Sequence, residues 1–374
     1  MEKSICFISR FAHYVLLNKT EELIGGAEFQ QTILAKALSA RGWKVSFITE
    51  KKDQQEPIVI DGIHLFPVID YTAGNRYMRR LLSVPCQLWR WMKTNNSQLY
   101  YQRNPGPFSS VIAMFCRSAG KRFILAGAND ANFDRKNELN VKSFLDVLEI
   151  RYGIKFADKI ILQNERQKSL LKQNYNREGI VFYNLYVPPA LENKSPIDVE
   201  TFKKPRLLWV GRLAPQKRPE MCLELARLLP NFEIIMVGSR TRQNDLAERI
   251  KKGVRSIENI IFMGHLPLSE VEELFDSILG LVNTSFVEGF PNTFLQAWSR
   301  GLPVFSFVEP DNIISNNNLG AKVSSIEEMA ASIRERLKDG QIFLDDVNRI
   351  RSFFDENFSV ETKITELERI LLTP

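Results

Sequence analysis

One loop of this sequence carries two cationic side chains behind a glycine, an order that suits a bound anion. In "LLWVGRLAPQKRPE", Gly211 ends an apolar run, Arg212 follows it, and Lys217 comes five residues later, shortly before a helical pattern. Arginine presents a planar fork of donors and lysine a compact point charge, so the two together can grip a diphosphate. Loop charges that simply face water would look the same, but the glycine at the end of the run favours an anion site.

A second loop places a lone carboxylate before a glycine turn and a short helical run. In "SFVEGFPNTFLQAWSRG", Glu288 precedes Gly289, and Gln296 lies eight residues after Glu288. Gly289 permits a tight turn, after which backbone N–H groups at a helix start could hold phosphate oxygens. These N–H groups are those of Phe290, Asn292 and Thr293. The plain alternative is a strand, turn and helix whose polar residues face water.

A third candidate lies near the N-terminus, in "LIGGAEFQQ". Gly25 and Gly26 directly precede a helical pattern, so their backbone could approach an anion closely at the positive end of the helix dipole. An ordinary glycine turn explains the two residues equally well.

The elements that must position these loops alternate between strands and helices. Apolar runs typical of buried strands lie at 4–9, 44–49, 98–103, 122–127, 159–164 and 179–184, and again at 206–211, 232–238, 259–264, 278–284 and 302–307. Amphipathic stretches separate them, and residues 186–205 lose periodicity and gather four prolines. This pattern predicts an α/β fold of two doubly wound domains, at 1–187 and 204–355, with a C-terminal helix in 356–374 that packs back on the domains.

Composition sets the class of protein. The chain has 374 residues, 44% hydrophobic and 25% charged, which fits two globular domains. The four cysteines form no C-x-x-C pair, so the sequence indicates neither a zinc site nor a disulfide framework and favours a reducing, cytoplasmic compartment. No run of about 18 uncharged apolar residues occurs, so no segment is expected to span a bilayer.

Positive charge concentrates in the first half. Residues 1–190 carry 27 Lys and Arg against 17 Asp and Glu. Within them, residues 76–93 ("RYMRRLLSVPCQLWRWMK") mix basic residues with leucines and tryptophans, as an interfacial helix on an anionic membrane does. A helix that packs its apolar side on the sheet, begun or kinked at Pro85, has the same composition. The two interpretations are compatible. Nucleic-acid binding is disfavoured, because the basic residues form no recognisable module.

Taken together and in this order, "GGAE", "VGRLAPQKRPE" and "EGFPNTFLQAWSRGLPV" resemble the GT-B glycosyltransferases, most closely the retaining family 4 type (glycosyl transferases group 1). The resemblance covers nearly the whole chain. It implies two Rossmann-like domains facing across a cleft, with the acceptor bound by the first and a nucleotide-sugar donor by the second. It also implies transfer of a hexose-type sugar to a glycan or lipid-linked acceptor, with retention, in surface polysaccharide or glycolipid biosynthesis at the inner face of a membrane.

The resemblance also assigns roles. Gly25 and Gly26 are similar to the loop that faces the donor phosphates and sugar, and Arg212 and Lys217 to the pair that neutralises the diphosphate. Glu288 resembles the first glutamate of a motif of two glutamates, which contacts the donor sugar, while residues 290–293 supply backbone donors. The base of the nucleotide is expected beside the loops at Ser239 and His265.

Two departures from the family pattern stand out. The second glutamate of the motif, which holds the ribose hydroxyls, is Gln296 here, and an amide in place of a carboxylate weakens that bond by about 1 kcal/mol. The histidine that many relatives carry in the first domain is replaced by "LAGANDANFD", where Asp130 is the group expected to face the acceptor.

The expected chemistry follows from charge. Fixed cations aimed at the leaving diphosphate stabilise the transition state more than the ground state. Since no D-x-D cluster ends a strand, we expect metal independence and no cofactor. A nucleotide-sugar 2-epimerase, which needs no acceptor, and a catalytically silent nucleotide-sugar-binding homologue remain alternatives. A dinucleotide oxidoreductase is disfavoured, because no G-x-G-x-x-G follows the first strand.

Overall fold

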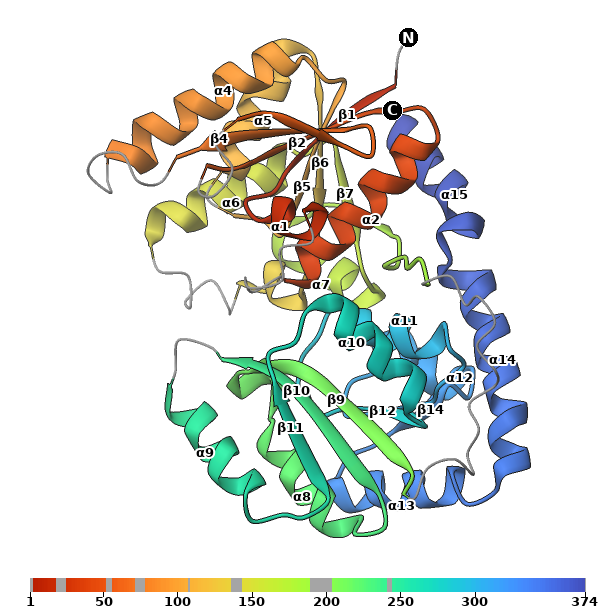
Figure 1. Cartoon of the computed structure of the whole chain (residues 1–374). Helices are drawn as coiled ribbons and strands as arrows, with labels where there is room; N and C mark the ends of the chain where they lie inside the picture. The colour runs from red at the N-terminus through yellow and green to blue at the C-terminus, as the bar shows by residue number, and fades with distance from the viewer. Residues whose placement is uncertain are drawn as a thin grey trace. The chain divides into compact units, whose positions relative to one another are not determined.

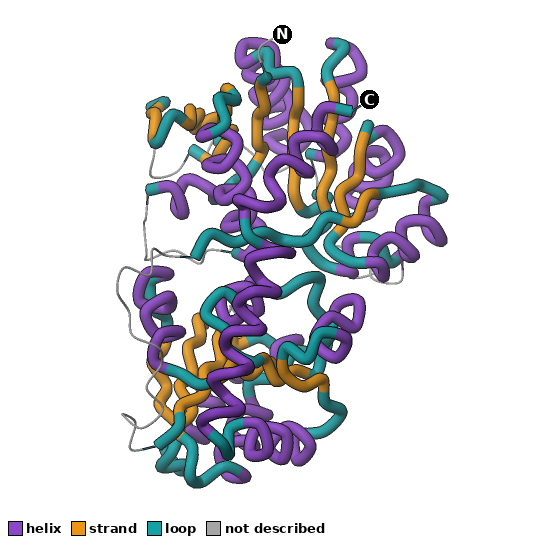
Figure 2. The backbone as a smooth tube through the Cα atoms, turned by 90° about the vertical axis from the view of Figure 1, so that its right-hand side faces the viewer, coloured by secondary structure: helices purple, strands orange, loops and turns teal. Residues whose placement is uncertain are grey.

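The computed structural model describes residues 3–17, 25–51, 56–70, 78–106, 108–135, 143–188, 204–240 and 244–373. Its contacts divide the chain into two compact units, residues 1–185 together with 363–374, and residues 186–362 (Figure 1). Each unit holds one sheet, drawn in orange between purple helices in Figure 2. The prediction of two Rossmann-like domains is confirmed at the level of the fold.

The first unit has an eight-stranded sheet in the order β3-β4-β2-β1-β5-β6-β7-β8. Its strands are β1 Ser4–Ile8, β2 Lys44–Glu50, β3 Ile58–Ile60, β4 Ile63–Ile69, β5 Leu99–Arg103, β6 Arg122–Ala126, β7 Lys159–Leu162 and β8 Ile180–Val181. Its helices are α1 Ala12–Leu16, α2 Gly26–Ala40, α4 Val84–Asn95, α5 Ser109–Ala119, α6 Phe144–Phe156 and α7 Glu165–Tyr175. Strand order reverses between β1 and β5, whose carboxyl ends therefore border the crevice where such sheets bind ligands.

Two strands of this sheet are absent from the prediction. β3 and β4 form an antiparallel hairpin around Asp61 and Gly62, both with positive φ (50° and 75°). That backbone suits a two-residue hairpin turn, for which Asp-Gly is a favoured sequence. The dipeptide was therefore the missed signal. The predicted strand at 179–184 is reduced to the two residues of β8.

The second unit has a six-stranded parallel sheet in the order β11-β10-β9-β12-β13-β14. Its strands are β9 Arg206–Leu213, β10 Glu233–Arg240, β11 Ile260–Gly264, β12 Gly280–Asn283, β13 Val304–Ser306 and β14 Gly320–Lys322. Its helices are α8 Glu220–Leu228, α9 Asn244–Val254, α10 Leu268–Leu274, α11 Asn292–Trp298, α12 Ile313–Asn316, α13 Ile326–Arg336 and α14 Gly340–Phe358. The carboxyl ends of β9 and β12, which are neighbours, carry the two loops singled out in the sequence.

The last helix, α15 Val360–Leu372, contributes its residues from 363 onward to the first unit. Glu368 on this helix is buried and accepts bonds from Trp43 Nε1 (2.6 Å) and Arg41 Nε (2.6 Å). At the end of α15, Lys159 Nζ binds the Ile370 carbonyl at 2.6 Å, as cations do at the negative end of a helix. The first unit is thus completed by residues 363–374, which follow its main part, residues 1–185, by more than 170 residues in the chain.

Candidate functional site

Two of the predicted site residues meet directly in the second unit. Lys217 ends the short 3₁₀ turn Pro215–Lys217 after β9, and its Nζ forms an ion pair with Glu288 Oε1 in the loop after β12. The Lys217 carbonyl accepts from Thr284 Oγ1 at 2.6 Å, and that hydroxyl in turn accepts from the buried Trp209 Nε1 at 2.8 Å. These bonds fix the two loops against each other, so the ion pair rests on a rigid base.

The Glu288 carboxylate is held by a second donor. Ser285 Oγ donates to Glu288 Oε1 at 2.7 Å. The side chains of Lys217 and Glu288 are 20% and 13% exposed, so the pair is largely shielded from water but still reachable. The arrangement places a cation and an anion side by side at the carboxyl edge of the sheet, where a polar ligand can contact both. Ser285 was not singled out from the sequence, although it stands three residues before Glu288.

Gly211 and Arg212 lie in β9, next to this pair along the chain. A Cβ at Gly211 would lie 3.7 Å from Lys217 Cγ and 3.1 Å from the Trp209 ring, so the glycine leaves room beside the lysine stem. Arg212 is exposed and pairs with Ser239 of β10 in backbone register. Within the described ranges the Arg212 side chain makes no ion pair or hydrogen bond. The structure therefore brings Lys217 to Glu288 but leaves Arg212 pointing to solvent.

The turn after Glu288 divides its residues between the core and the surface. The Phe290 side chain is buried against Trp298 and Phe358, with ring centroids 6.4 and 5.5 Å away. Helix α11 begins at Asn292, and its N-cap Pro291 makes no side-chain capping bond. Asn292 and Thr293 are half-buried at this helix start.

Gln296 lies on α11 against a carboxylate that sequence reasoning missed. Its Nε2 donates to Glu272 Oε1 at 2.7 Å, and Glu272 Oε2 accepts from Arg300 Nη2 at 3.0 Å and from the Tyr186 hydroxyl at 2.5 Å. Burial raises the pKa of the Tyr186 phenol and the Glu272 carboxylate raises it further, so the phenol keeps its proton and donates. Glu272 sits in the acidic run "SEVEEL" of α10, where nothing in the sequence marks it.

The two loops that are expected to border the base of the nucleotide contain Ser239 and His265. His265 is exposed and follows Gly264 at the end of β11, and Ser239 lies on β10 with its side chain outside the described part of the structure. No described contact joins either residue to Lys217 or Glu288.

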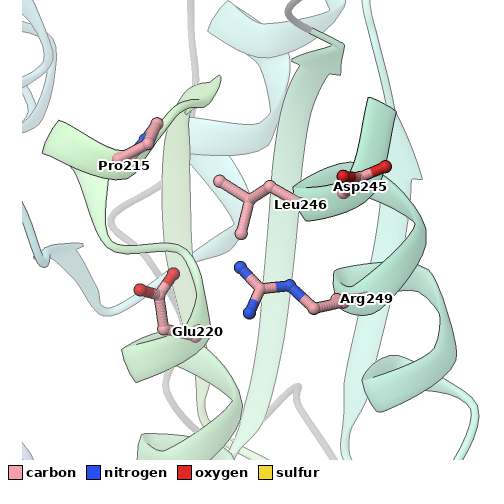
Figure 3. Close-up of a pocket in the computed structure, with 5 residues that line it drawn as sticks. All are labelled: Pro215, Glu220, Asp245, Leu246 and Arg249. Atoms are coloured by element: carbon pink, nitrogen blue, oxygen red, sulfur yellow. The ribbon is translucent and has the colours of Figure 1, made fainter. Parts of the chain in front are cut away.

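A separate hollow of about 300 Å³ opens between the start of α8 and the start of α9 (Figure 3). Its lining residues are Pro215, Glu220, Asp245, Leu246 and Arg249. In Figure 3, Arg249 extends from α9 toward the helix that carries Glu220. Because two carboxylates and one guanidinium line this hollow, its net charge is negative and disfavours a diphosphate. We do not assign it to the predicted anion site.

In the first unit, Gly25 is the N-cap of α2 and Gly26 its first residue. A Cβ at Gly25 would lie 2.4 Å from Glu28 Oε2, so the glycine makes room for the Glu28 carboxylate at the helix start. The site predicted for a ligand anion therefore already has a carboxylate beside it. The role of Gly25 and Gly26 toward the donor stays a prediction.

Asp130 is buried at the carboxyl edge of the same sheet, in the short turn after β6. Its Oδ1 accepts from Asn164 Nδ2 at 3.0 Å and Gln167 Nε2 at 3.2 Å, and its Oδ2 lies 3.4 Å from Arg166 Nε. The carboxylate is thus held firmly in one orientation. Its assigned role toward an acceptor stays a prediction.

Comparisons with known proteins agree with this architecture. Residues 204–339 match the protein family described as "Glycosyl transferases group 1". An uncharacterised glycosyltransferase of Methanocaldococcus jannaschii is 28% identical over 216 residues, covering 54% of this chain and 51% of that protein. The O-antigen chain mannosyltransferase B of Escherichia coli is 25% identical over 181 residues, covering 44% and 47%. The chain thus spans about half the length of the curated relatives it matches.

A solved structure of Anabaena Alr3699/HepE in complex with UDP superposes with a TM-score of 0.71 at 16% identity, covering 99% of both chains. This likeness shows the GT-B fold. No helix among the described residues is both long and apolar enough to cross a membrane.

Proposed function

We propose that this chain is a glycosyltransferase of the Glycosyl transferases group 1 family, whose model matches residues 204–339. In this proposal it transfers a hexose-type sugar from a nucleotide-diphosphate sugar to a glycan or lipid-linked acceptor, with retention of configuration. The pathway we propose is surface polysaccharide or glycolipid assembly. The O-antigen mannosyltransferase among the relatives supports this direction, and the UDP held by the similar Anabaena protein makes UDP-sugars the first donors to try.

The observation that carries the proposal is the ion pair of Lys217 and Glu288. In the reaction the bond between the anomeric carbon and the diphosphate oxygen breaks, and its electron pair leaves with the diphosphate. The acceptor hydroxyl oxygen bonds to the anomeric carbon, and the hydroxyl proton leaves on the departing phosphate or to water. Lys217 suits the negative charge that grows on the diphosphate, and Glu288 suits the positive charge that grows on the sugar ring.

The same ion pair explains how the charged Lys217 side chain stays in place before the donor binds. Glu288 neutralises Lys217 before donor binds, which lowers the cost of keeping a partly buried cation in place. When a diphosphate enters, Lys217 gains a second anionic partner and Glu288 becomes available to the sugar. We place Arg212, with its unoccupied guanidinium fork, on the outer phosphate oxygens. The groups at Ser239 and His265 are proposed to border the base.

A binding screen tests this assignment. UDP-, GDP- and ADP-sugars are added to the whole chain and thermal unfolding is followed, with Lys217→Met and the exposed Lys252→Met as a matched pair in the same unit. We expect at least one nucleotide sugar to raise the unfolding temperature of the parent and of Lys252→Met, and the shift to shrink in Lys217→Met. The donor site is refuted if no nucleotide stabilises the chain, or if Lys217→Met responds like its control.

The alternative of a silent homologue is motivated by Gln296, and the geometry around Gln296 weighs against it. The Glu272 carboxylate lies 2.7 Å from the Gln296 amide nitrogen. A negatively charged hydrogen-bond acceptor therefore remains at this place in the fold. A 2-epimerase is distinguished by product analysis. Donor incubated alone would yield the epimeric sugar, whereas a transferase needs an added acceptor to release nucleotide at full rate.

We also propose that the first unit contacts an anionic membrane through the start of α4. The inner face of this helix is buried in the core through Val84, Leu88 and Met92. Leu81 and Leu82 are exposed in the helical turn that directly precedes α4. On α4 itself, Trp89 is exposed together with the basic Arg90 and Lys93. Both interpretations of residues 76–93 are thus compatible with the structure. Arg76 and the side chains of Arg79 and Arg80 lie outside the described part.

Vesicle sedimentation tests the membrane contact. We expect the chain to sediment with vesicles that contain phosphatidylglycerol and to stay in the supernatant with pure phosphatidylcholine. The double variant Leu81→Ser, Leu82→Ser should lose this binding, whereas Ile180→Ser, at an exposed apolar residue elsewhere in the unit, should keep it. Equal binding by the two variants would contradict the proposed surface.

A further inference from the structure

Arg103 is a buried arginine whose charge meets only neutral partners. It ends β5, is 9% exposed, and its Nη2 donates to Asn184 Oδ1 at 2.5 Å. With its amide oxygen turned toward these donors, Gln163 accepts from the same Nη2 at 2.7 Å and donates to the Ala128 carbonyl at 2.9 Å. The Arg103 Nε has no hydrogen-bond partner in the described structure, although it is fully buried.

The carboxylate closest along the hydrogen-bonded network does not compensate this charge. The Gln163 backbone N–H donates to Gln167 Oε1 at 3.0 Å, and Gln167 Nε2 donates to Asp130 at 3.2 Å. Asp130 is therefore reached from Arg103 only through two amide side chains, and it already has Arg166 as an ionic partner. Within the described ranges, no ion pair involves Arg103.

The one other arginine that is buried among the described residues has ionic partners within the chain. Arg300, which is also buried, is paired with both Glu272 and Asp276, at 3.0 and 2.8 Å. A cation removed from water is stable when an anion compensates it, and an unpaired donor is costly to bury. The contrast indicates that the anionic partner of Arg103 comes from outside the chain.

The position of Arg103 suits a ligand site. It lies at the carboxyl end of β5, beside β1, where the strand order reverses and where sheets of this type bind ligands. Its partner Asn184 is followed by Leu185, whose backbone is held by Gln30 of α2 through bonds of 2.8 and 3.2 Å. Asn184 and Gln163 thus hold the guanidinium in a fixed position at this edge of the sheet.

We propose that Arg103 binds an anionic group, phosphate or carboxylate, on the acceptor. The inference rests on the proposed function and narrows it, since it assigns the acceptor to the class of sugar phosphates or acidic sugars. The donor diphosphate is assigned to Lys217 and Arg212 of the second unit, which leaves the anion at Arg103 to the other substrate. Gln163 and Asn184 position the guanidinium and do not themselves carry charge.

Hydrogen–deuterium exchange of the whole chain can locate the site while the acceptor itself is still unidentified. The probes are glucose 1-phosphate, glucuronate and neutral glucose, each with and without saturating UDP. We expect at least one of the two anions to slow exchange in peptides that cover 98–106 and 179–188, and glucose to leave them unchanged. Protection by the sugar phosphate alone identifies a phosphorylated acceptor, and protection by glucuronate alone an acidic sugar. Protection by neither, with or without UDP, overturns the proposal.

Variants test the residue itself. Arg103→Met should weaken anion protection of these peptides by roughly 10-fold or more, as expected for the loss of charge-assisted hydrogen bonds. Arg117→Met, which removes an exposed arginine of α5, should not. Should Arg103→Met fail to fold, Arg103→Lys keeps the charge but loses the planar fork, and is expected to weaken binding less. Unchanged binding in the folded Arg103 variants refutes the assignment.

The donor site is read in the same experiment. UDP should protect peptides that cover 211–218 and 284–296, whatever happens at Arg103. Loss of the anion effect with the UDP effect retained therefore rejects the acceptor inference alone. Absence of this protection with UDP, GDP and ADP alike rejects the proposed function.

Discussion

The Gln296 side chain donates a hydrogen bond to the Glu272 carboxylate across 2.7 Å, so an amide and a carboxylate share one largely buried site. Arg300 and Tyr186 donate to the other oxygen of the same carboxylate. The site therefore has one negative charge and a full set of donors around it. A second carboxylate would have to displace a donor.

Replacing Gln296 by Glu should destabilise the protein rather than restore a lost function. Two carboxylates at this distance repel each other, so one of them has a raised pKa in the folded state. A raised pKa means that the folded state binds a proton more readily than the unfolded state. The loss, roughly 1–3 kcal/mol near neutral pH, is thus relieved as the pH falls. Urea unfolding at several pH values measures it.

The control for this variant is Gln173→Glu, at an exposed position of α7, which should change the free energy of unfolding little at any pH. Greater stability of Gln296→Glu than the parent at neutral pH would contradict the description of the pair.

Glu288→Gln should separate binding from chemistry. The amide keeps the shape and the bond from Ser285, but it loses the charge that faces Lys217 and the reacting sugar. We expect kcat for sugar transfer to fall about 100-fold or more with a smaller change in KM, as for loss of a transition-state interaction. Ser285→Ala, which keeps the carboxylate, should cost much less. A fall confined to KM would assign Glu288 to ground-state binding.

The bonds that Trp43, Arg41 and Lys3 donate to Glu368 on α15, here called the Glu368 clamp, predict that the stability of the protein depends on pH. Burial alone would raise the pKa of Glu368, but hydrogen bonds from Trp43, Arg41 and Lys3 outweigh it and lower the pKa below its usual value. A lowered folded-state pKa stabilises the protein above the unfolded value of about 4.3, and this contribution is lost as the pH falls through the folded value. Glu368→Gln should therefore lose roughly 1–3 kcal/mol near neutral pH and show a flatter acid limb.

Urea unfolding between about pH 3 and 7 checks this expectation, and Glu361→Gln, at an exposed residue of the same helix, is the control. If both variants followed the acid curve of the parent, the clamp would have no ionic component.

Thiol chemistry provides an independent check of burial. Cys6, Cys116 and Cys222 are buried, whereas Cys86 on α4 is exposed. Burial raises the pKa of the Cys6 and Cys222 thiols to about 12, so they are not thiolates at neutral pH. We expect Ellman's reagent to titrate a single thiol in the native chain and none in Cys86→Ser. Rapid reaction of a second thiol in the native state would show that one of the cores opens readily.

More of the fold than of the candidate site could be predicted from the sequence. Apolar runs predicted every strand except β3, β4 and β14, since buried parallel strands read as continuous hydrophobic segments. β14 has only three residues, Gly320–Lys322, which is too short to form a pattern.

The site depends on partners that are distant in the chain. Lys217 and Glu288 are 71 residues apart, and only a family resemblance placed them in one site before the structure joined them. Glu272 could not be found, because its neighbours in α10 are acidic as well. In the sequence, Arg103 looks like an ordinary residue at the end of a strand. Its significance comes from the lack of a carboxylate partner among the described residues, which only the structure reveals. Periodicity reports burial of apolar side chains, and it says nothing about which polar groups are left without a partner.

The closing of the first unit by residues 363–373 has a consequence for synthesis on the ribosome. The pocket that receives Glu368 is made early, by Trp43 and Arg41, but its carboxylate emerges only after the whole of the second unit has been translated. During that interval the nascent first unit exposes an aromatic donor and unmatched cations. A stall before residue 363 would leave the first unit without these contacts.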